Sequence, residues 1–194
     1  KRAERLPIWQ LEPVVLEINE LLASLPEVQK FSVAGSFRRV AETSKDVDFI
    51  VATEEHEAVR EAILSRLVIL ETVAAGDTKI SVILDREEPV SVDFRLVKEH
   101  EFATALHHFT GSKDHNVRMR QLAKSQGKKI SEYGVEQPDG TIATFDTEEA
   151  FFAHFDLPYI PPTVRESGKE LDRIDELAGL VQLEHIMSDL HMHT

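Results

Sequence analysis

The chain has 194 residues, 42% of them hydrophobic and 29% charged, as expected of a globular protein with one good-sized core or two small subdomains. It contains no cysteine, which excludes disulfides, thiolate catalysis and Cys-type zinc sites, and no apolar run long enough to span a membrane. The net charge of -13 disfavours contact with nucleic-acid phosphates over most of the surface. We expect a fragment of a longer protein, since the sequence opens at Lys1 without methionine or a signal peptide and stops abruptly at Thr194. The absence of cysteine fits a cytoplasmic setting, and we expect a monomer.

The first half of the chain combines helical and strand-like patterns. Apolar residues at helical spacing predict a helix over 8–25, ended by Pro26, and a second helix is expected over 55–67. Runs rich in β-branched residues predict strands over 28–34, 46–52, 68–74, 79–84 and 90–97. Gly76-Asp77 is suited to a hairpin turn between two of these strands. The pattern predicts an α+β domain with a mixed β-sheet flanked by helices, covering residues 1–107.

From His108 onward the composition changes to that of a second, smaller α+β unit covering residues 108–165. Its expected elements are a helix over 112–126 capped by Ser112, short paired strands at 129–135 and 142–145, and a short helix capped by Thr147. The charged, helix-prone residues that follow predict a linker, so that 166–194 forms a third segment.

A basic run interrupts the acidic character of the chain between His100 and Ile130. It holds six basic residues against two acidic ones, the basic ones being Lys113, Arg118, Arg120, Lys124, Lys128 and Lys129. Such a run is typical either of a solvated helix face or of a surface that contacts nucleic-acid phosphates. Composition alone leaves both interpretations open.

The pattern with the most chemical content is Gly35-Ser36 followed by Asp46-Val47-Asp48. Residues two apart on a strand share a face, so Asp46 and Asp48 present paired carboxylates, which suit hard cations such as Mg²⁺ or Mn²⁺. The Gly-Ser turn offers backbone N–H groups and a hydroxyl to phosphate. A lone Asp-x-Asp can also be a solvated surface pair. If the strand that holds Asp93 lies beside the Asp46–Asp48 strand, three carboxylates converge, enough for two metal ions.

The string Gly35-Ser36-Phe37-Arg38-Arg39 with Asp46-Val47-Asp48 resembles the DNA polymerase X (polymerase beta-like) family within the nucleotidyltransferase superfamily. Later motifs resemble that family in the same order: Asp93 in Val-Asp-Phe-Arg-Leu, His108-Phe109-Thr110-Gly111-Ser112, Asn116 to Arg120, and Ser131-Glu132-Tyr133. The resemblance covers about residues 4–166. It implies a nucleotidyltransferase palm over 1–107 and a nucleotide-selection subdomain, thumb- or fingers-like, over 108–165.

The resemblance also implies roles for individual residues. Asp46 and Asp48 would ligate two Mg²⁺ or Mn²⁺ ions, and Asp93 would hold the catalytic one and help to accept the primer hydroxyl's proton. Lys79 would contact the DNA template backbone. The implied nucleotide-binding residues are Gly35, Ser36, Arg39 and Arg5 at the triphosphate, His108, Phe109 and Gly111 at the sugar and base, and Asn116 and Arg120 at the minor-groove edge.

A gating role is implied for Arg95, which shares a strand face with Asp93. In the family, an arginine at this position leaves the second aspartate for the Glu-Tyr pair when the enzyme closes. We therefore expect Arg95 near Asp48 without metal, and near Glu132 or Tyr133 in a closed state.

Three residues depart from the family pattern. His108 stands where a tyrosine is common, which puts sugar discrimination in doubt. Lys113 replaces a familiar acid, and Lys45 replaces a common glycine before the first aspartate. The small amino-terminal lyase domain of the family has no counterpart in this sequence.

The tail, Ser188 to Thr194, ends in His191-Met192-His193. A His-x-His pair alone supplies half of a tetrahedral shell and is often incidental. Its context resembles the first motif of a PHP domain, which follows the polymerase in bacterial family X proteins. The resemblance implies that His191 and His193 belong to a Zn²⁺ or Mn²⁺ site of a truncated PHP domain.

The sequence thus predicts a template-directed DNA polymerase that fills short gaps in DNA repair, with gapped or primed DNA and deoxynucleoside triphosphates as partners. One alternative is a nucleotidyltransferase that acts on RNA or on a small molecule. The other is a scaffold that binds DNA without catalysis. The three aspartates argue against a scaffold, because clustered like charges serve no structural purpose there.

Overall fold

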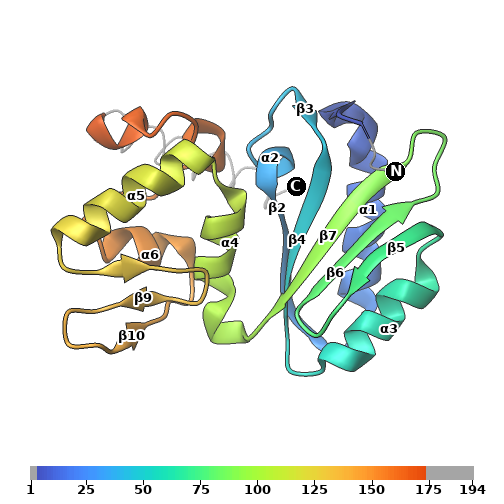
Figure 1. Ribbon diagram of the computed structural model, residues 1–194, viewed down its shortest axis with the longest axis horizontal. Coiled ribbons are helices and arrows are strands. Elements are labelled where there is room, and N and C mark those ends of the chain that lie inside the picture. Colours follow the sequence, from blue (N-terminus) through green and yellow to red (C-terminus); the bar gives the residue numbers. More distant parts are fainter. Residues whose placement is uncertain (1–3, 174–194) are drawn as a thin grey trace, which may run out of the picture.

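The computed structural model describes residues 4–173, which form two lobes that meet at helix α4 (Figure 1). The larger lobe is built on a five-stranded sheet in the order β2-β4-β7-β6-β5, in which β4 and β7 are parallel and the other neighbours antiparallel. Its strands are β2 (Val28–Ala34), β4 (Asp46–Thr53), β5 (Ile69–Ala75), β6 (Lys79–Leu84) and β7 (Val90–Val97). The predicted mixed sheet and the hairpin at Gly76-Asp77 are confirmed.

One face of this sheet is buried beneath helices α1 (Ile8–Ser24) and α3 (His56–Arg66) (Figure 1). Alternate residues of β4 and β7 enter this core, and the rings of Phe49 and Phe94 stack there at a centroid distance of 5.8 Å. Helix α1 contributes Leu11 and Ile18 to the same cluster. Each large side chain so buried contributes about 1.5–3 kcal/mol, which fixes the sheet against the two helices. Across residues 4–173, no helix has the length and apolar character that a membrane crossing requires.

The opposite face is covered at one end by α4 (Phe102–Thr110). Ala105 and Leu106 of α4 pack against Ile50 and Val97, which lie in the second halves of β4 and β7. The first halves of the same strands carry the aspartates. Helix α4 therefore makes one end of this face apolar and leaves the acidic end uncovered by that helix.

The smaller lobe consists of α5 (Lys113–Ser125), α6 (Glu148–Ala153) and a three-stranded sheet of order β10-β9-β8. Its strands are β8 (Lys129–Ile130), β9 (Val135–Glu136) and β10 (Ile142–Ala143). The predicted caps are confirmed, because Ser112 accepts a hydrogen bond from the His115 N–H and Thr147 accepts one from the Ala150 N–H.

Two local expectations need correction. The strand expected over 129–135 is two strands, β8 and β9, because the N–H of Ser131 bonds the Gly134 carbonyl at 3.0 Å and closes a turn between them. The turn expected at Gly35-Ser36 is the start of a one-turn helix, α2 (Gly35–Arg38). Two-residue strands β1 (Leu6–Pro7) and β3 (Thr43–Ser44), which the sequence did not predict, pair beside it.

The boundaries expected at 107 and 165 stay predictions, and both fall within packed segments of the structure. The first falls inside α4, whose Leu106 packs on the large sheet while His107 packs on Phe151 of the small lobe. A helix with apolar surface on both sides belongs to both cores. Beyond 165, the described part of the expected linker contains a 3-10 turn (Lys169–Asp172), and its Leu171 is buried in the small lobe's core. The described residues 166–173 are thus part of that lobe.

Candidate active site

The three predicted aspartates come from two neighbouring strands. Asp48 of β4 lies directly opposite Asp93 of β7, and Asp46 lies opposite Ser91. All three side chains are half-buried, whereas the intervening Val47 is fully buried on the other face. The placement of Asp93 beside the Asp46–Asp48 strand is confirmed, because strand alternation and parallel register bring the carboxylates to one patch of the sheet.

Asp48 lies in surroundings that disfavour its charged form. Its pKa is raised to about 7, chiefly by burial and further by the charges of Asp93 and Asp46, while Arg95 and Lys79 act in the opposite direction. Its Oδ2 lies where a side chain at residue 35 would begin, since a Cβ on Gly35 would stand 2.6 Å from that oxygen. Gly35 also has a φ of +65°, so this position requires glycine on two counts.

The donor set suits a divalent cation, because three carboxylates on one patch repel one another until a positive charge is shared between them. Within residues 4–173, however, no three His, Asp or Glu side chains are already gathered as ligands around one point. The strand register supplies the carboxylates, and binding of an ion would require their side chains to turn toward each other. Their role as metal ligands remains a prediction.

A cavity of about 530 Å³ opens beside Asp48, between the large sheet and the small lobe. All nine predicted nucleotide-binding residues line it, namely Arg5, Gly35, Ser36, Arg39, His108, Phe109, Gly111, Asn116 and Arg120. Lys113 also lines it, so four Lys or Arg side chains face the cavity against the single carboxylate of Asp48. Such a cavity can attract a polyanion, and the individual roles of the nine residues remain predictions.

Helix α2 connects this cavity to the small lobe. Arg39 Nη1 donates to the carbonyl of Thr110 at 2.6 Å, and burial lowers the pKa of Arg39, partly offset by the charge of Glu166. The hydroxyls of Ser36 and Ser44 lie 2.5 Å apart, and Arg5 donates to Thr43. These bonds fix the Gly-Ser turn against the segment that leads into Asp46.

The predicted gating residues line a second cavity of about 260 Å³. Arg95, Glu132, Tyr133 and Lys79 all line it. The Arg95 guanidinium lies 4.0 Å above the ring of Phe109. The positive charge of Arg95 also acts to lower the pKa of Asp48. Arg95 thus lies on the Asp93 face of the sheet and shares its cavity with the Glu-Tyr pair, the two neighbours that the switch requires.

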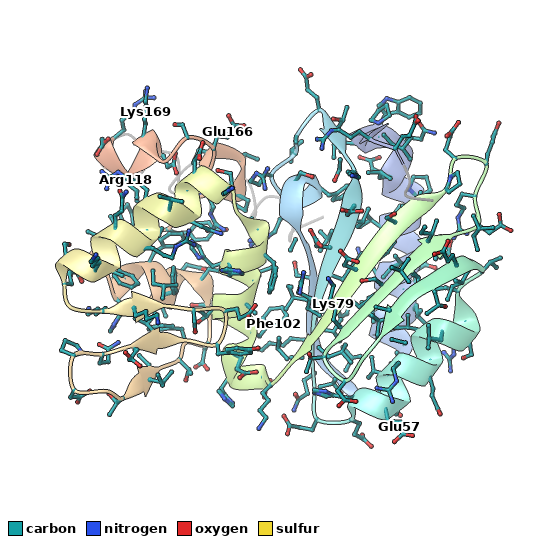
Figure 2. All side chains as sticks on the ribbon, viewed as in Figure 1. Glu57, Lys79, Phe102, Arg118, Glu166 and Lys169 are labelled. Atoms are coloured by element: carbon teal, nitrogen blue, oxygen red, sulfur yellow. The ribbon has the colours of Figure 1, made fainter. Side chains whose placement is uncertain are left out.

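Lys79 begins β6 and is exposed toward the space between the sheet and α4 (Figure 2).

The ring of His108 lies edge-on to that of Phe109, with the ring centroids 4.7 Å apart. Burial lowers the pKa of His108, and the charge of Glu132 partly offsets this. The tail residues His191 and His193 lie outside the described residues.

Sequence reasoning missed a buried ionic cluster behind the cavity. Glu148 of α6 accepts hydrogen bonds from both Arg38 of α2, at 3.0 and 2.7 Å, and Arg165, at 3.0 and 3.3 Å. Arg38 also donates to Thr110 Oγ1 at 3.0 Å. Arg38 and Glu148 are 110 positions apart, so no local pattern could have paired them. Only an apolar setting around a charged residue hinted at the cluster, as with Glu148 beside Phe151 and Phe152.

Comparisons with known proteins agree with this arrangement. A family model described as DNA polymerase beta palm matches residues 5–87, and one described as DNA polymerase beta thumb matches residues 105–166. The whole chain is 52% identical to the DNA polymerase/3'-5' exonuclease PolX of Bacillus subtilis (strain 168), and it spans 34% of that protein's length. It is also 36% identical over 86 residues to DNA polymerase lambda of Rattus norvegicus, a match that covers 39% of this chain and 15% of that polymerase.

Proposed function

The chain belongs to the DNA polymerase X (polymerase beta-like) family, and we propose that it is a template-directed DNA polymerase that fills short gaps in DNA repair. One observation carries the proposal: the cavity lined by all nine predicted nucleotide-binding residues also contains Asp48, which lies on the same patch of the sheet as Asp46 and Asp93. A triphosphate bound in this cavity would lie next to the carboxylates.

Asp46 and Asp48 would hold two divalent ions, Mg²⁺ or Mn²⁺, and Asp93 would share in holding the catalytic one. When bound, these ions lower the pKa of the primer 3′-hydroxyl and neutralise charge on the attacking and leaving oxygens. Asp93 would accept the hydroxyl's proton. The attacking oxygen then forms a bond to the α-phosphorus, and the bond to the departing pyrophosphate breaks.

The remaining residues would bind and orient the nucleotide. Arg39 and Arg5 would neutralise the triphosphate, with Ser36 and the Gly35 backbone beside it. Phe109 and Gly111 would line the sugar and base. Asn116 donates from Nδ2 to the His108 carbonyl at 2.8 Å, so its amide is already oriented at the cavity wall, where it would face the minor-groove edge together with Arg120.

Arg95 would act as a switch between two carboxylate partners. Its stacking on Phe109 and its charge near Asp48 support the open, metal-free position, and Glu132 and Tyr133 are available in the same cavity. Closing of the small lobe would transfer the guanidinium to that pair and free Asp48 for metal. The partners would be gapped or primed DNA and deoxynucleoside triphosphates, bound by a monomer in the cytoplasm.

The decisive experiment measures transfer of one labelled nucleotide to three acceptors: gapped DNA, primed RNA and a small-molecule alcohol. We expect Mg²⁺- or Mn²⁺-dependent extension of the DNA primer by the templated nucleotide. Preferential transfer to RNA or to the alcohol would favour the alternative nucleotidyltransferase. Metal-dependent triphosphate binding by calorimetry provides a second readout, and its absence together with an absence of transfer would leave only a DNA-binding scaffold.

DNA binding by this acidic chain should be non-specific and salt-sensitive. The exposed basic residues include Lys79 beside the second cavity and Lys113 at the start of α5. Each phosphate contact that is lost should reduce the slope of log affinity against log salt by about 0.7–0.9. We expect Lys79→Ala to weaken binding and to flatten this slope by roughly one contact. Lys169→Ala, an exposed lysine on the small lobe far from Lys79 in Figure 2, is the matched control and should leave the slope unchanged.

A further inference from the structure

A short segment, Arg165–Asp172, crosses the first half of α5, and we call it the strap (Figure 2). At its start, the N–H of Ser112 bonds the Arg165 carbonyl at 3.1 Å, and the Ser112 hydroxyl donates to the Glu166 carbonyl. At its end, Arg118 pairs with Asp172 at 2.5 Å. The strap is thus held along two turns of α5.

The middle of the strap lies directly against α5 at Gly168. Its φ is +85°, and an added Cβ would stand 3.1 Å from the Arg118 side chain and 3.1 Å from the Asp114 carbonyl. The conformation favours glycine, and the close contacts leave little room for a side chain. The turn that follows directs the side chain of Glu170 into the lobe, where it is 8% exposed.

Inside the lobe, Glu170 ends a chain of three buried polar side chains. Its Oε2 lies 2.7 Å from His115 Nδ1, and His115 Nε2 lies 3.0 Å from His107 Nε2. A carboxylate only accepts, so Nδ1 of His115 carries a proton and its Nε2 accepts from the N–H of His107. The other Glu170 oxygen accepts from the Gly168 N–H at 2.9 Å. Every donor in this chain has one defined partner.

The charges in this chain are equally well defined. Burial lowers the pKa of both imidazoles, and the charge of Arg165 reinforces the effect at His107. Burial alone would raise the pKa of Glu170, but the hydrogen bonds from His115 and the Gly168 backbone hold it below its usual value. Two imidazoles and one carboxylate therefore form a connected network. His107 Nδ1 is buried without a hydrogen-bond partner among the described residues, and breaking either of the two bonds would leave further buried polar groups unpaired.

This network lies immediately behind the nucleotide cavity. His107 precedes His108 and Phe109, which line the cavity from the end of α4. His115 precedes Asn116, which lines it from the start of α5. The imidazole–imidazole bond therefore joins the two helix ends that carry the lining residues, and the strap supports the bond from the far side.

We propose that Glu170 is a positioning residue which, through His115 and His107, holds the ends of α4 and α5 at the spacing that nucleotide binding requires. The strap would then belong to the nucleotide site although none of its residues touches that cavity. This inference rests on the proposed polymerase function. An apolar core would fill the same space without fixing one arrangement, whereas the directional bonds between Glu170 and His115 and between His115 and His107 favour a single one.

The test uses steady-state incorporation of one correct nucleotide on gapped DNA by the chain and its variants. Glu170→Ala and His115→Phe should each raise KM for the nucleotide by roughly five- to twentyfold and change kcat by less than about twofold. The double variant should match the larger single effect, because both substitutions break the same contact. Glu170→Gln, which keeps one acceptor oxygen for His115 and is the mildest change to the fold, should give a smaller rise.

The matched control is Asp172→Ala, which removes the strap's exposed ion pair with Arg118 and should leave KM within about twofold. An unchanged KM in all three Glu170 and His115 variants would overturn the positioning role. So would a loss of kcat in proportion to the loss of folded protein at constant KM, because that is the result of a purely structural role. An absence of extension by the unsubstituted chain would instead count against the proposed function itself.

Discussion

Replacing Asp93 by alanine is expected to reduce nucleotide transfer on gapped DNA by about three orders of magnitude without unfolding the protein. Asp93 lies opposite Asp48 in the parallel register, so its loss removes one of the proposed metal ligands and the proposed proton acceptor together. Single groups that stabilise transition-state charge are typically worth 10²–10³ in rate, and metal positioning adds to this. The measurement is single-nucleotide extension with Mg²⁺ and with Mn²⁺.

The same variant should be as stable as the unsubstituted protein, or slightly more so. The charge of Asp93 helps to raise the pKa of Asp48, which means that the two carboxylates repel each other in the absence of metal. Removing Asp93 should therefore lower the pKa of Asp48 and leave the thermal midpoint unchanged or higher. Asp85→Ala, an exposed acid just after β6, is the control and should retain activity within about twofold. Undiminished transfer by Asp93→Ala with either metal would end the three-aspartate proposal.

The second large effect is expected at Glu148, which should contribute to stability rather than to chemistry. Glu148 is 5% exposed, and its carboxylate bonds to Arg38 and Arg165, the latter fully buried. Removing one partner of a buried ionic cluster leaves uncompensated charge, at a cost of about 3–5 kcal/mol. We expect Glu148→Ala to lower the free energy of unfolding in urea by that amount, and Glu149→Ala, its exposed neighbour, to change it by less than about 0.5 kcal/mol.

This contribution should depend on pH in a defined direction. Burial alone would raise the pKa of Glu148, but the two arginines outweigh it and hold the pKa below its usual value of 4.5. A depressed carboxyl pKa adds stability that is fully present above the unfolded value and is lost as the pH falls through the folded one. The gap between the unsubstituted protein and Glu148→Ala should therefore be constant near neutral pH and narrow below about pH 4.5. A gap that widens in acid would contradict this assignment.

Much of the site's framework follows from short-range patterns. The alternation in Asp46 to Thr53 and in Val90 to Val97 already assigns the aspartates to one strand face and the apolar residues to the other. The caps Ser112 and Thr147 follow from the preference of hydroxyl side chains for helix N-termini. These features depend on contacts within a few residues, so the sequence alone is sufficient to predict them.

Other features depend on which segments, far apart in the sequence, pack against each other. The sequence could not reveal that α4 shields one half of the sheet face and leaves the aspartates clear of it, because this requires the packing of Leu106 against Ile50. Nor could it predict the pairing of Glu148 with Arg38 and Arg165, or of Glu170 with His115, since those partners are 110, 17 and 55 positions apart. The sequence by itself determined which residues share a strand face and which residues cap the helices, through periodicity and local hydrogen bonding. The tertiary structure decided which distant charges are buried together. A buried charge is costly unless it is paired, and only the fold brings such distant partners into contact.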